Sequence, residues 1–139
     1  MKQDQTTLCI PTQGQGLFEF TTEMNTWVRS VGITQGLLTV FCRHTSASLT
    51  VQENADPDVK FDMVECFKSL VPQSETKYRH ANEGLDDMPA HIRTSLTDVS
   101  VSIPVQNGLP VLGMWQGMYV FEHRNHAHNR EVVLHLIGT

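Results

Sequence analysis

Cysteine is scarce in this sequence of 139 residues, and its three copies, Cys9, Cys42 and Cys66, are widely spaced and form no C-x-x-C pair. An odd number of cysteines at such spacing argues against a disulfide framework and against a structural zinc site made of cysteines. We expect reduced thiols instead. Cys42 is expected to be inert because it lies in an apolar strand, where burial raises the pKa of a thiol.

Basic blocks and long apolar runs are also missing. The formal net charge is −5, and this acidic balance argues against nucleic acid or an anionic membrane as the main partner. No apolar run approaches the roughly 20 residues of a membrane-spanning helix. Residues Met1–Thr7 lack the apolar segment of a signal peptide. These absences predict a cytoplasmic protein.

Glycine-rich phosphate motifs are absent too. The sequence contains neither G-x-x-x-x-G-K nor G-x-G-x-x-G, which excludes the usual nucleotide-binding folds. Ser46 lacks the G-x-S-x-G context of a hydrolase nucleophile. A local anion pocket stays open, because guanidinium groups suit bidentate phosphate contacts, although an exposed surface role is the simpler interpretation for each arginine alone. The side chains available for such a pocket are Thr45, Ser46, Ser48, Arg43, Arg93, Arg124 and Arg130.

What the sequence does contain predicts one domain over residues 1–139. Apolar residues at a helical spacing predict a helix around Trp27 that ends at Gly32. Pro57, preceded by Asp56 as N-cap, starts the main helix, and Pro72 stops it. A short helix carries His91. The expected strands span residues 6–10, 16–20, 36–42, 49–51, 99–105, 111–115, 117–122 and 131–137.

These elements do not alternate regularly between helix and strand, which favours the α+β class with a largely antiparallel sheet and helices on one side or end. The segment 36–42 is nearly continuous apolar sequence, so we expect it to be buried on both faces. Asn107-Gly108 predicts a hairpin turn. The segment 125–129 is expected to be a loop.

A polar segment, Tyr78–Ile92, interrupts this apolar pattern and holds two histidines and three carboxylates. With His44, which follows a buried strand, His80 and His91 would make three imidazole ligands, the number typical of a catalytic zinc site. The spacing neither supports nor excludes this, because such sites are assembled from separate segments. Hydrogen-bonded histidines without a metal are the alternative interpretation.

The three carboxylates of that segment are Glu83, Asp86 and Asp87. A carboxylate beside a metal site can act as general base or orient a ligand histidine. One of the two aspartates is expected to cap the short helix, and Glu83 is the better candidate for chemistry. A solvated surface remains the alternative for Glu83.

Several longer segments resemble one family closely. They are Cys42–Thr50, Glu53–Asp58, Glu83–His91, Leu112–Gly117, Glu122–Arg124 and Ile137-Gly138. In this order, and over nearly the whole chain, they are similar to the YjbQ family, also called secondary thiamine-phosphate synthases. Two positions depart from the family pattern: Met114 stands where threonine is usual, and the loop 125–129 is rich in histidine.

The resemblance implies a sandwich-like α+β domain with two main helices and one short helix, assembled as a homotrimer. It also implies a site with a divalent metal ion, zinc or magnesium, held by His44, His80 and His91. The activity credited to the family is a weak thiamine phosphate synthase reaction, which joins an aminopyrimidine methyl diphosphate to a thiazole phosphate and releases pyrophosphate.

Residues can be assigned to this reaction by role. Glu83, Ser46 and Asp87 are the expected catalytic residues. Binding of the small phosphorylated metabolite is expected from Thr45, Trp115, Gln116, Arg124 and Arg130. Two other functions stay open at this point: a metal-dependent hydrolase of a small metabolite, because three-histidine zinc favours hydrolysis, and a non-enzymatic protein that binds a ligand or metal.

Overall fold

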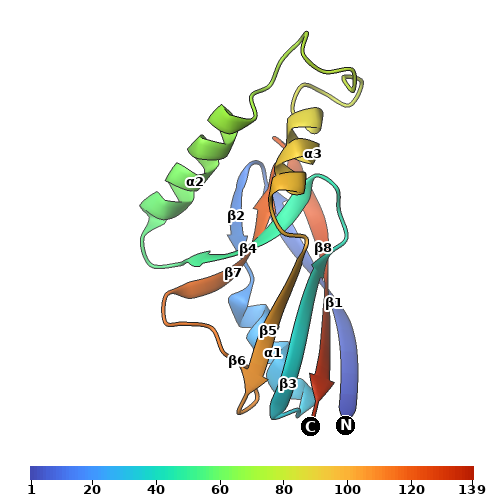
Figure 1. Ribbon diagram of the computed structural model, residues 1–139, viewed down its shortest axis with the longest axis vertical. Helices are drawn as coiled ribbons and strands as arrows, with labels where there is room; N and C mark the ends of the chain where they lie inside the picture. Colours follow the sequence, from blue (N-terminus) through green and yellow to red (C-terminus); the bar gives the residue numbers. More distant parts are fainter.

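The computed structural model describes residues 1–139, which form two antiparallel sheets and three helices (Figure 1). The larger sheet has the order β1-β8-β3-β5-β6 and the smaller one the order β2-β7-β4. The larger sheet contains β1 (Lys2–Gln13), β8 (Ala127–Gly138), β3 (Gln35–Cys42), β5 (Ser100–Gln106) and β6 (Leu109–Pro110). The smaller sheet contains β2 (Gly16–Glu19), β7 (Gln116–Glu122) and β4 (Ala47–Glu53). This confirms the α+β class and the antiparallel sheets.

The main core lies between the two sheets and helix α1 (Thr21–Val31). Met24 and Val28 of α1 are fully buried in it, as their helical spacing predicts. Gly32 ends the helix in the left-handed conformation, with φ 77°. The helix start differs from the usual pattern. Phe20 is the N-cap residue, and its side chain has no acceptor with which to cap the helix. The neighbouring Thr21 hydroxyl donates to Glu19 Oε2 and accepts from the Met118 amide.

The prediction that strand 36–42 is buried on both faces was wrong. In β3 the residues alternate between the core and an open face, where Leu37 and Phe41 are exposed. No helix covers that outer face of the larger sheet (Figure 1). The strand expected at 111–115 is absent, and β8 begins at Ala127, inside the expected loop. The long pairing of β8 with β1 supplies its backbone partners there.

Helices α2 (Pro57–Leu70) and α3 (Asp87–Leu96) lie at the end of the molecule opposite the two termini (Figure 1). The predicted start of α2 is confirmed, since the Asp56 carboxylate accepts from the Asp58 amide at 2.9 Å. The helix packs only partly buried side chains on the small sheet, with the Phe67 ring 5.0 Å from Phe121. The loop that joins the two helices forms the extreme end of the molecule, away from the termini (Figure 1).

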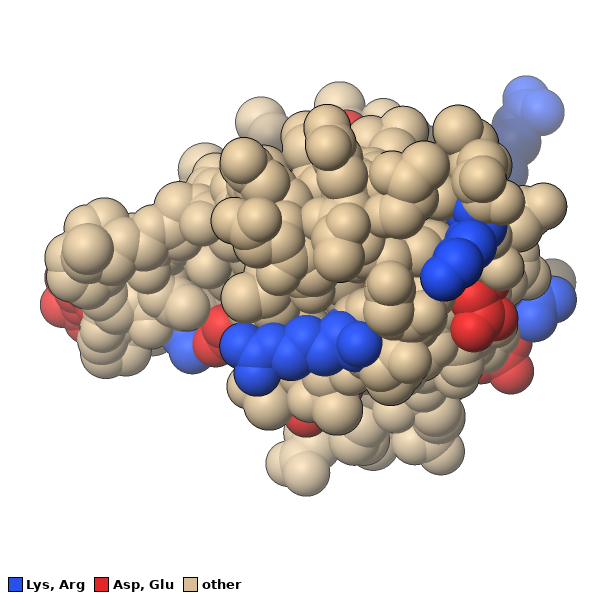
Figure 2. Space-filling model, turned by 90° about the horizontal axis from the view of Figure 1, so that it is seen from below, with Lys and Arg blue, Asp and Glu red and all other residues tan.

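The end of the molecule that carries the termini looks different. Its surface is mostly uncharged, with single basic and acidic side chains between apolar and polar ones (Figure 2). None of the three helices is long and apolar enough to cross a membrane.

Candidate metal centre

Three side chains that can ligate a metal meet at the start of α3: His80, Asp87 and His91. Asp87 and His91 are one helical turn apart, and His80 reaches them from the loop before the helix. His80 Nε2 lies 2.6 Å and His91 Nε2 lies 3.1 Å from the same oxygen, Asp87 Oδ2. The three candidate ligand atoms lie within 4.8 Å of one another. This arrangement provides two imidazoles and one carboxylate.

The hydrogen bond made by His91 Nδ1 decides whether Nε2, which faces Asp87, carries a proton or a lone pair. Nδ1 lies 2.8 Å from the Thr45 carbonyl oxygen, which only accepts, so Nδ1 carries the proton. In neutral His91 the Nε2 lone pair then faces the Asp87 carboxylate. Two such acceptors repel each other unless a proton or a metal ion lies between them. The donor set therefore fits a divalent cation, and Thr45 fixes the ligating tautomer.

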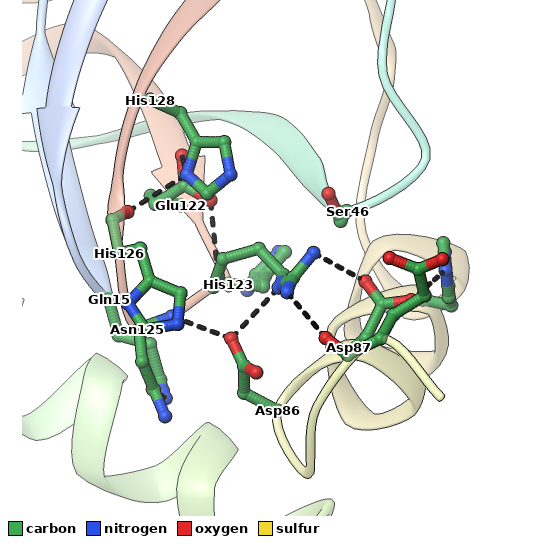
Figure 3. Close-up of polar contacts among 12 residues, drawn as sticks. Gln15, Ser46, Asp86, Asp87, Glu122, His123, Asn125, His126 and His128 are labelled. Carbon is green, nitrogen blue, oxygen red and sulfur yellow. Dashed lines mark hydrogen bonds and ion pairs between the residues drawn. The ribbon is translucent and has the colours of Figure 1, made fainter. Parts of the chain in front are cut away.

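Asp86 and Asp87 lie near each other (Figure 3), and Arg124 holds both of them. Its Nε donates to Asp86 Oδ2 at 2.8 Å, its NH1 to Asp87 Oδ1 at 2.7 Å, and its NH2 to the Glu83 carbonyl at 3.0 Å. Burial by itself would raise the pKa of the Asp87 carboxyl, but the His80 hydrogen bond and the Arg124 charge outweigh it and hold that pKa below its usual range. Asp87 is thus an anion whose Oδ1 is held by Arg124 and whose Oδ2 faces the two histidines.

Asp86 is the N-cap residue of α3 but does not cap it through its side chain, in contrast to the expectation that one of the two aspartates would do so. Its carboxylate accepts instead from Arg124 and, at 2.9 Å, from the Asn125 amide. Burial would raise the pKa of Asp86, yet these bonds lower it. The residue therefore joins the turn after β7 to the start of α3.

His44 does not join His80 and His91 in this cluster. Its Nε2 accepts from the Glu131 backbone amide at 2.7 Å, and burial lowers its pKa. It lines a neighbouring cavity of about 620 Å³, which also includes Thr45. Three of the other lining residues, Thr94, Ser95 and Thr97, come from α3 or the turn after it. His44 is therefore placed beside the cluster of His80, Asp87 and His91 rather than in it, and Asp87 is the third side chain there that could ligate a metal.

Ser46 and Arg130 are engaged inside the protein. Arg130 Nε donates to Glu122 Oε2 at 2.6 Å, and its NH2 donates to Ser46 Oγ at 3.0 Å. All three residues are buried, and Thr12 adds a bond to Glu122 at 2.7 Å. Burial would raise the pKa of Glu122, but the Arg130 and Thr12 bonds lower it. The Arg130–Glu122 ion pair and its hydrogen bonds to Thr12 and Ser46 join β1, β7, β8 and the β3–β4 loop inside the protein.

Trp115 and Gln116 lie at the opposite end of β7 from the metal cluster. The Trp115 side chain is 59% exposed, and Gln116 Oε1 accepts from the Gly113 amide at 2.7 Å within a tight turn. Glu83 lies on the exposed loop before α3, where only its carbonyl has a partner among the hydrogen bonds. Within one subunit, Trp115 and Gln116 are therefore not brought to the histidines.

Comparison with known proteins identifies the family. The family model described as UPF0047 protein YjbQ-like matches residues 6–139. The chain belongs to the UPF0047, or YjbQ-like, family. It is 52% identical to UPF0047 protein sll1880 of Synechocystis sp. over 137 residues, which cover 99% of this chain and 93% of that protein. It is 39% identical to UPF0047 protein YjbQ of Escherichia coli O157:H7, over 96% of this chain and 97% of that protein.

A solved structure supports the same YjbQ-like assignment. The conserved hypothetical protein TT1486 from Thermus thermophilus superimposes with a TM-score of 0.85 at 31% identity, covering 95% of this chain and 99% of that chain. None of these three names states a reaction. The family resemblance seen in the sequence is thereby confirmed. An activity has to be argued from the geometry of the site.

Sequence reasoning missed two buried polar residues of this YjbQ-like chain, Glu122 and His123. His123 is 1% exposed, its Nε2 lies 2.9 Å from Ser48 Oγ, and burial lowers its pKa to about 3. Phe121 packs against its ring at 4.4 Å. In the sequence, these residues appeared only within the family-like segment Glu122–Arg124 and as polar residues directly following an apolar strand, a pattern that also fits an exposed turn.

Proposed function

We propose that this YjbQ-like protein is a divalent-metal-dependent enzyme that acts on a small phosphorylated metabolite. Its metal ligands are His80, Asp87 and His91. The observation that carries the proposal is the contact between His91 Nε2 and Asp87 Oδ2, because Thr45 commits the other ring nitrogen to donation. When bound, the ion supplies a Lewis acid and lowers the pKa of its water.

Residues around the ligands have separate tasks in this proposal. The Thr45 carbonyl orients His91, and Arg124 orients Asp87; such partners commonly change metal affinity by roughly 10- to 100-fold. The cavity beside His44 receives the metabolite, with Thr45, Ser95 and Thr97 offering polar groups. Glu83, exposed on the loop before α3, is the candidate general base.

Hydrolysis is the reaction that the donor set supports best. Two histidines and one carboxylate recur as the protein ligands of catalytic zinc in hydrolases. The buried ion pair between Arg130 and Glu122 also favours hydrolysis over the synthase reaction. A departing diphosphate needs guanidinium groups to neutralise its charge, and the Arg130 guanidinium is already paired with Glu122.

Thiamine phosphate synthase activity is the second candidate. The observation in its favour is the neighbouring pair of Asp86 and Asp87, both deprotonated and both held by Arg124. One or two carboxylates together with substrate phosphates are the usual environment of magnesium in phosphate chemistry. In this case Arg124 would stabilise the leaving diphosphate from behind the aspartates.

Metal analysis tests the site. Purified wild-type protein is expected to hold one equivalent of divalent metal, measured by mass spectrometry of the elements, and His91→Ala and Asp87→Asn to lose it. His135→Ala is the matched control, since that histidine lies on the open face of β8 and bonds only to Gln3. Stoichiometric metal that survives in both site variants would refute the ligand assignment.

Activity assays separate the functions. A panel of phosphate monoesters and diphosphates is incubated with the metal-loaded protein, and released phosphate is measured. The two thiamine precursors are incubated separately, and thiamine phosphate is measured by fluorescence after oxidation. Turnover in only one assay selects that reaction. Ligand binding by calorimetry without turnover in either assay would leave a non-enzymatic binding protein and reject the enzyme proposal.

We also propose that the protein is a cytoplasmic homotrimer. Exposed apolar side chains support the assembly: Met114 is 83% exposed beside Trp115, and Leu37 and Phe41 stand on the open face of β3. Contact with another subunit would cover them. The three free cysteines are compatible with a reducing compartment. Light scattering after gel filtration gives the mass, and a monomer at micromolar concentration would refute the trimer.

A further inference from the structure

Arg93 on α3 is the largest fully buried side chain of the protein, with 2% of its surface exposed. Its guanidinium donates only to neutral carbonyl oxygens. NH2 donates to the Val71 carbonyl at 2.7 Å, and NH1 donates to Gln15 Oε1 at 3.0 Å and to the His123 carbonyl at 3.4 Å. A buried cation is normally paired with an anion, and here no ion pair is formed with any Asp or Glu.

The hydrogen bonds of Arg93 leave part of the group unused. A guanidinium has five N–H donors, and three acceptors are present. The Nε atom is buried and has no partner. A buried donor without an acceptor is rare and destabilising. The residue therefore carries a charge with no acidic group in contact, and it has free donor capacity.

Arg93 is one of six residues that line a cavity of about 370 Å³, none of them hydrophobic. The cavity contains a second cation, Lys68 of α2, whose ammonium has only an exposed contact with Glu65 at 3.5 Å. No acidic residue lines the cavity. Its wall consists of Gln15, Lys68, Pro72, Gln73, Arg93 and Asn125. The Gln15 amide is already engaged, because its Nε2 donates to Asn125 Oδ1 at 2.6 Å and its Oε1 accepts from Arg93. The side-chain amides of Gln73 and Asn125 and the two cations, around one polar cavity, are the chemistry that recognises an oxyanion.

We propose that this cavity, the Arg93–Lys68 cavity, binds a small oxyanion of the phosphate type, either inorganic phosphate or the phosphate group of a metabolite. The cavity is separate from the metal centre. Asn125 lines it and bonds through its backbone to Asp86, whereas Asp87 lies on the other side of Asp86 (Figure 3). The inference does not rest on the proposed enzyme function.

Calorimetry with inorganic phosphate, at constant ionic strength set by chloride, tests the proposal on the full-length protein. Saturable one-site binding is expected for the wild type, with a rise in Tm in proportion to occupancy. Lys68→Met is expected to weaken binding by about fivefold, since an exposed cation contributes up to about 1 kcal/mol. Gln73→Glu, which adds a carboxylate to the wall, is expected to abolish it.

Arg93 also bonds three carbonyl groups, so its own replacement would disturb folding, and the two wall variants carry the test instead. Lys60→Met is the matched control, because Lys60 lies on the same helix but does not line the cavity. His91→Ala separates this site from the metal centre and is expected to bind phosphate like the wild type. Equal effects of the two lysine variants, no binding beyond chloride, or loss of binding in His91→Ala would overturn the proposal.

Discussion

Arg124 and Asp87 form the contact on which the proposed metal centre depends, with NH1 2.7 Å from Asp87 Oδ1. The opposite oxygen of the same carboxylate faces His80 and His91. One guanidinium therefore sets the orientation of the carboxylate oxygen that the two histidines approach. Because Arg124 also holds Asp86, it connects the turn after β7 to the start of α3.

Replacing this arginine should weaken metal binding without removing a ligand. Arg124→Gln is expected to lower metal affinity by roughly 10- to 100-fold, the usual effect of losing a partner of a ligand. Competition with a chelator of known affinity measures the change. Arg43→Gln, which removes only an exposed pair with Glu131, serves as the control. An Arg124→Gln affinity equal to the wild-type value would show that Arg124 does not orient Asp87.

Replacing only one member of the buried Glu122–Arg130 ion pair should lower the free energy of unfolding strongly. Arg130→Met leaves the Glu122 carboxylate buried, with only Thr12 and the Arg124 amide as donors. The expected loss of unfolding free energy is about 3–5 kcal/mol. Urea denaturation measures it. The double variant Glu122→Leu with Arg130→Met should recover part of the loss, and a double variant less stable than the single one would contradict this account.

His123 should make the protein sensitive to acid. Its pKa is about 3 in the folded protein and 6.5 as an ordinary histidine, because burial excludes the charged ring. Its contribution to stability is therefore fully present above pH 6.5 and is lost as the pH falls toward about 3, at about 1 kcal/mol per pH unit. Denaturation of wild type and His123→Phe is compared between pH 7 and pH 4.

The difference in unfolding free energy between these two proteins should shrink steadily across that window. If the wild-type and His123→Phe curves run parallel from pH 7 to pH 4, His123 does not titrate with unfolding as described.

Gly36 should not tolerate a side chain. Here β3 lies so close to β8 that a Cβ would overlap the Ile137 carbonyl oxygen. Gly36→Ala is expected to destabilise the protein by about 1–3 kcal/mol through overpacking against backbone. Gly32→Ala meets no atom within 4 Å and carries only the strain of its positive φ, about 1–2 kcal/mol. Thermal unfolding of both variants ranks the two effects, and an unchanged Tm for Gly36→Ala would disprove the close approach.

Much of the fold followed from local patterns. The left-handed Gly32 after α1 and the Asp56 cap before α2 lie at the predicted positions, because caps depend on neighbouring residues alone. Asn107 and Gly108 both have positive φ, as the hairpin turn requires. The exposure of Phe41 was not predictable, since a run of apolar residues does not say whether a second layer covers the sheet.

For the candidate site, local sequence patterns predicted less, and the tertiary structure decided more. The amino-acid sequence alone was enough for the family, the antiparallel α+β class, and the concentration of histidines and carboxylates in Tyr78–Ile92. The choice of partners required the folded chain. The backbone amide of Glu131 donates a hydrogen bond to His44 Nε2, so His44 lies apart from the other two histidines. The third side chain beside His80 and His91 is Asp87. The physical reason is distance along the chain: Glu131 lies 87 residues from His44, and no local periodicity records such a contact.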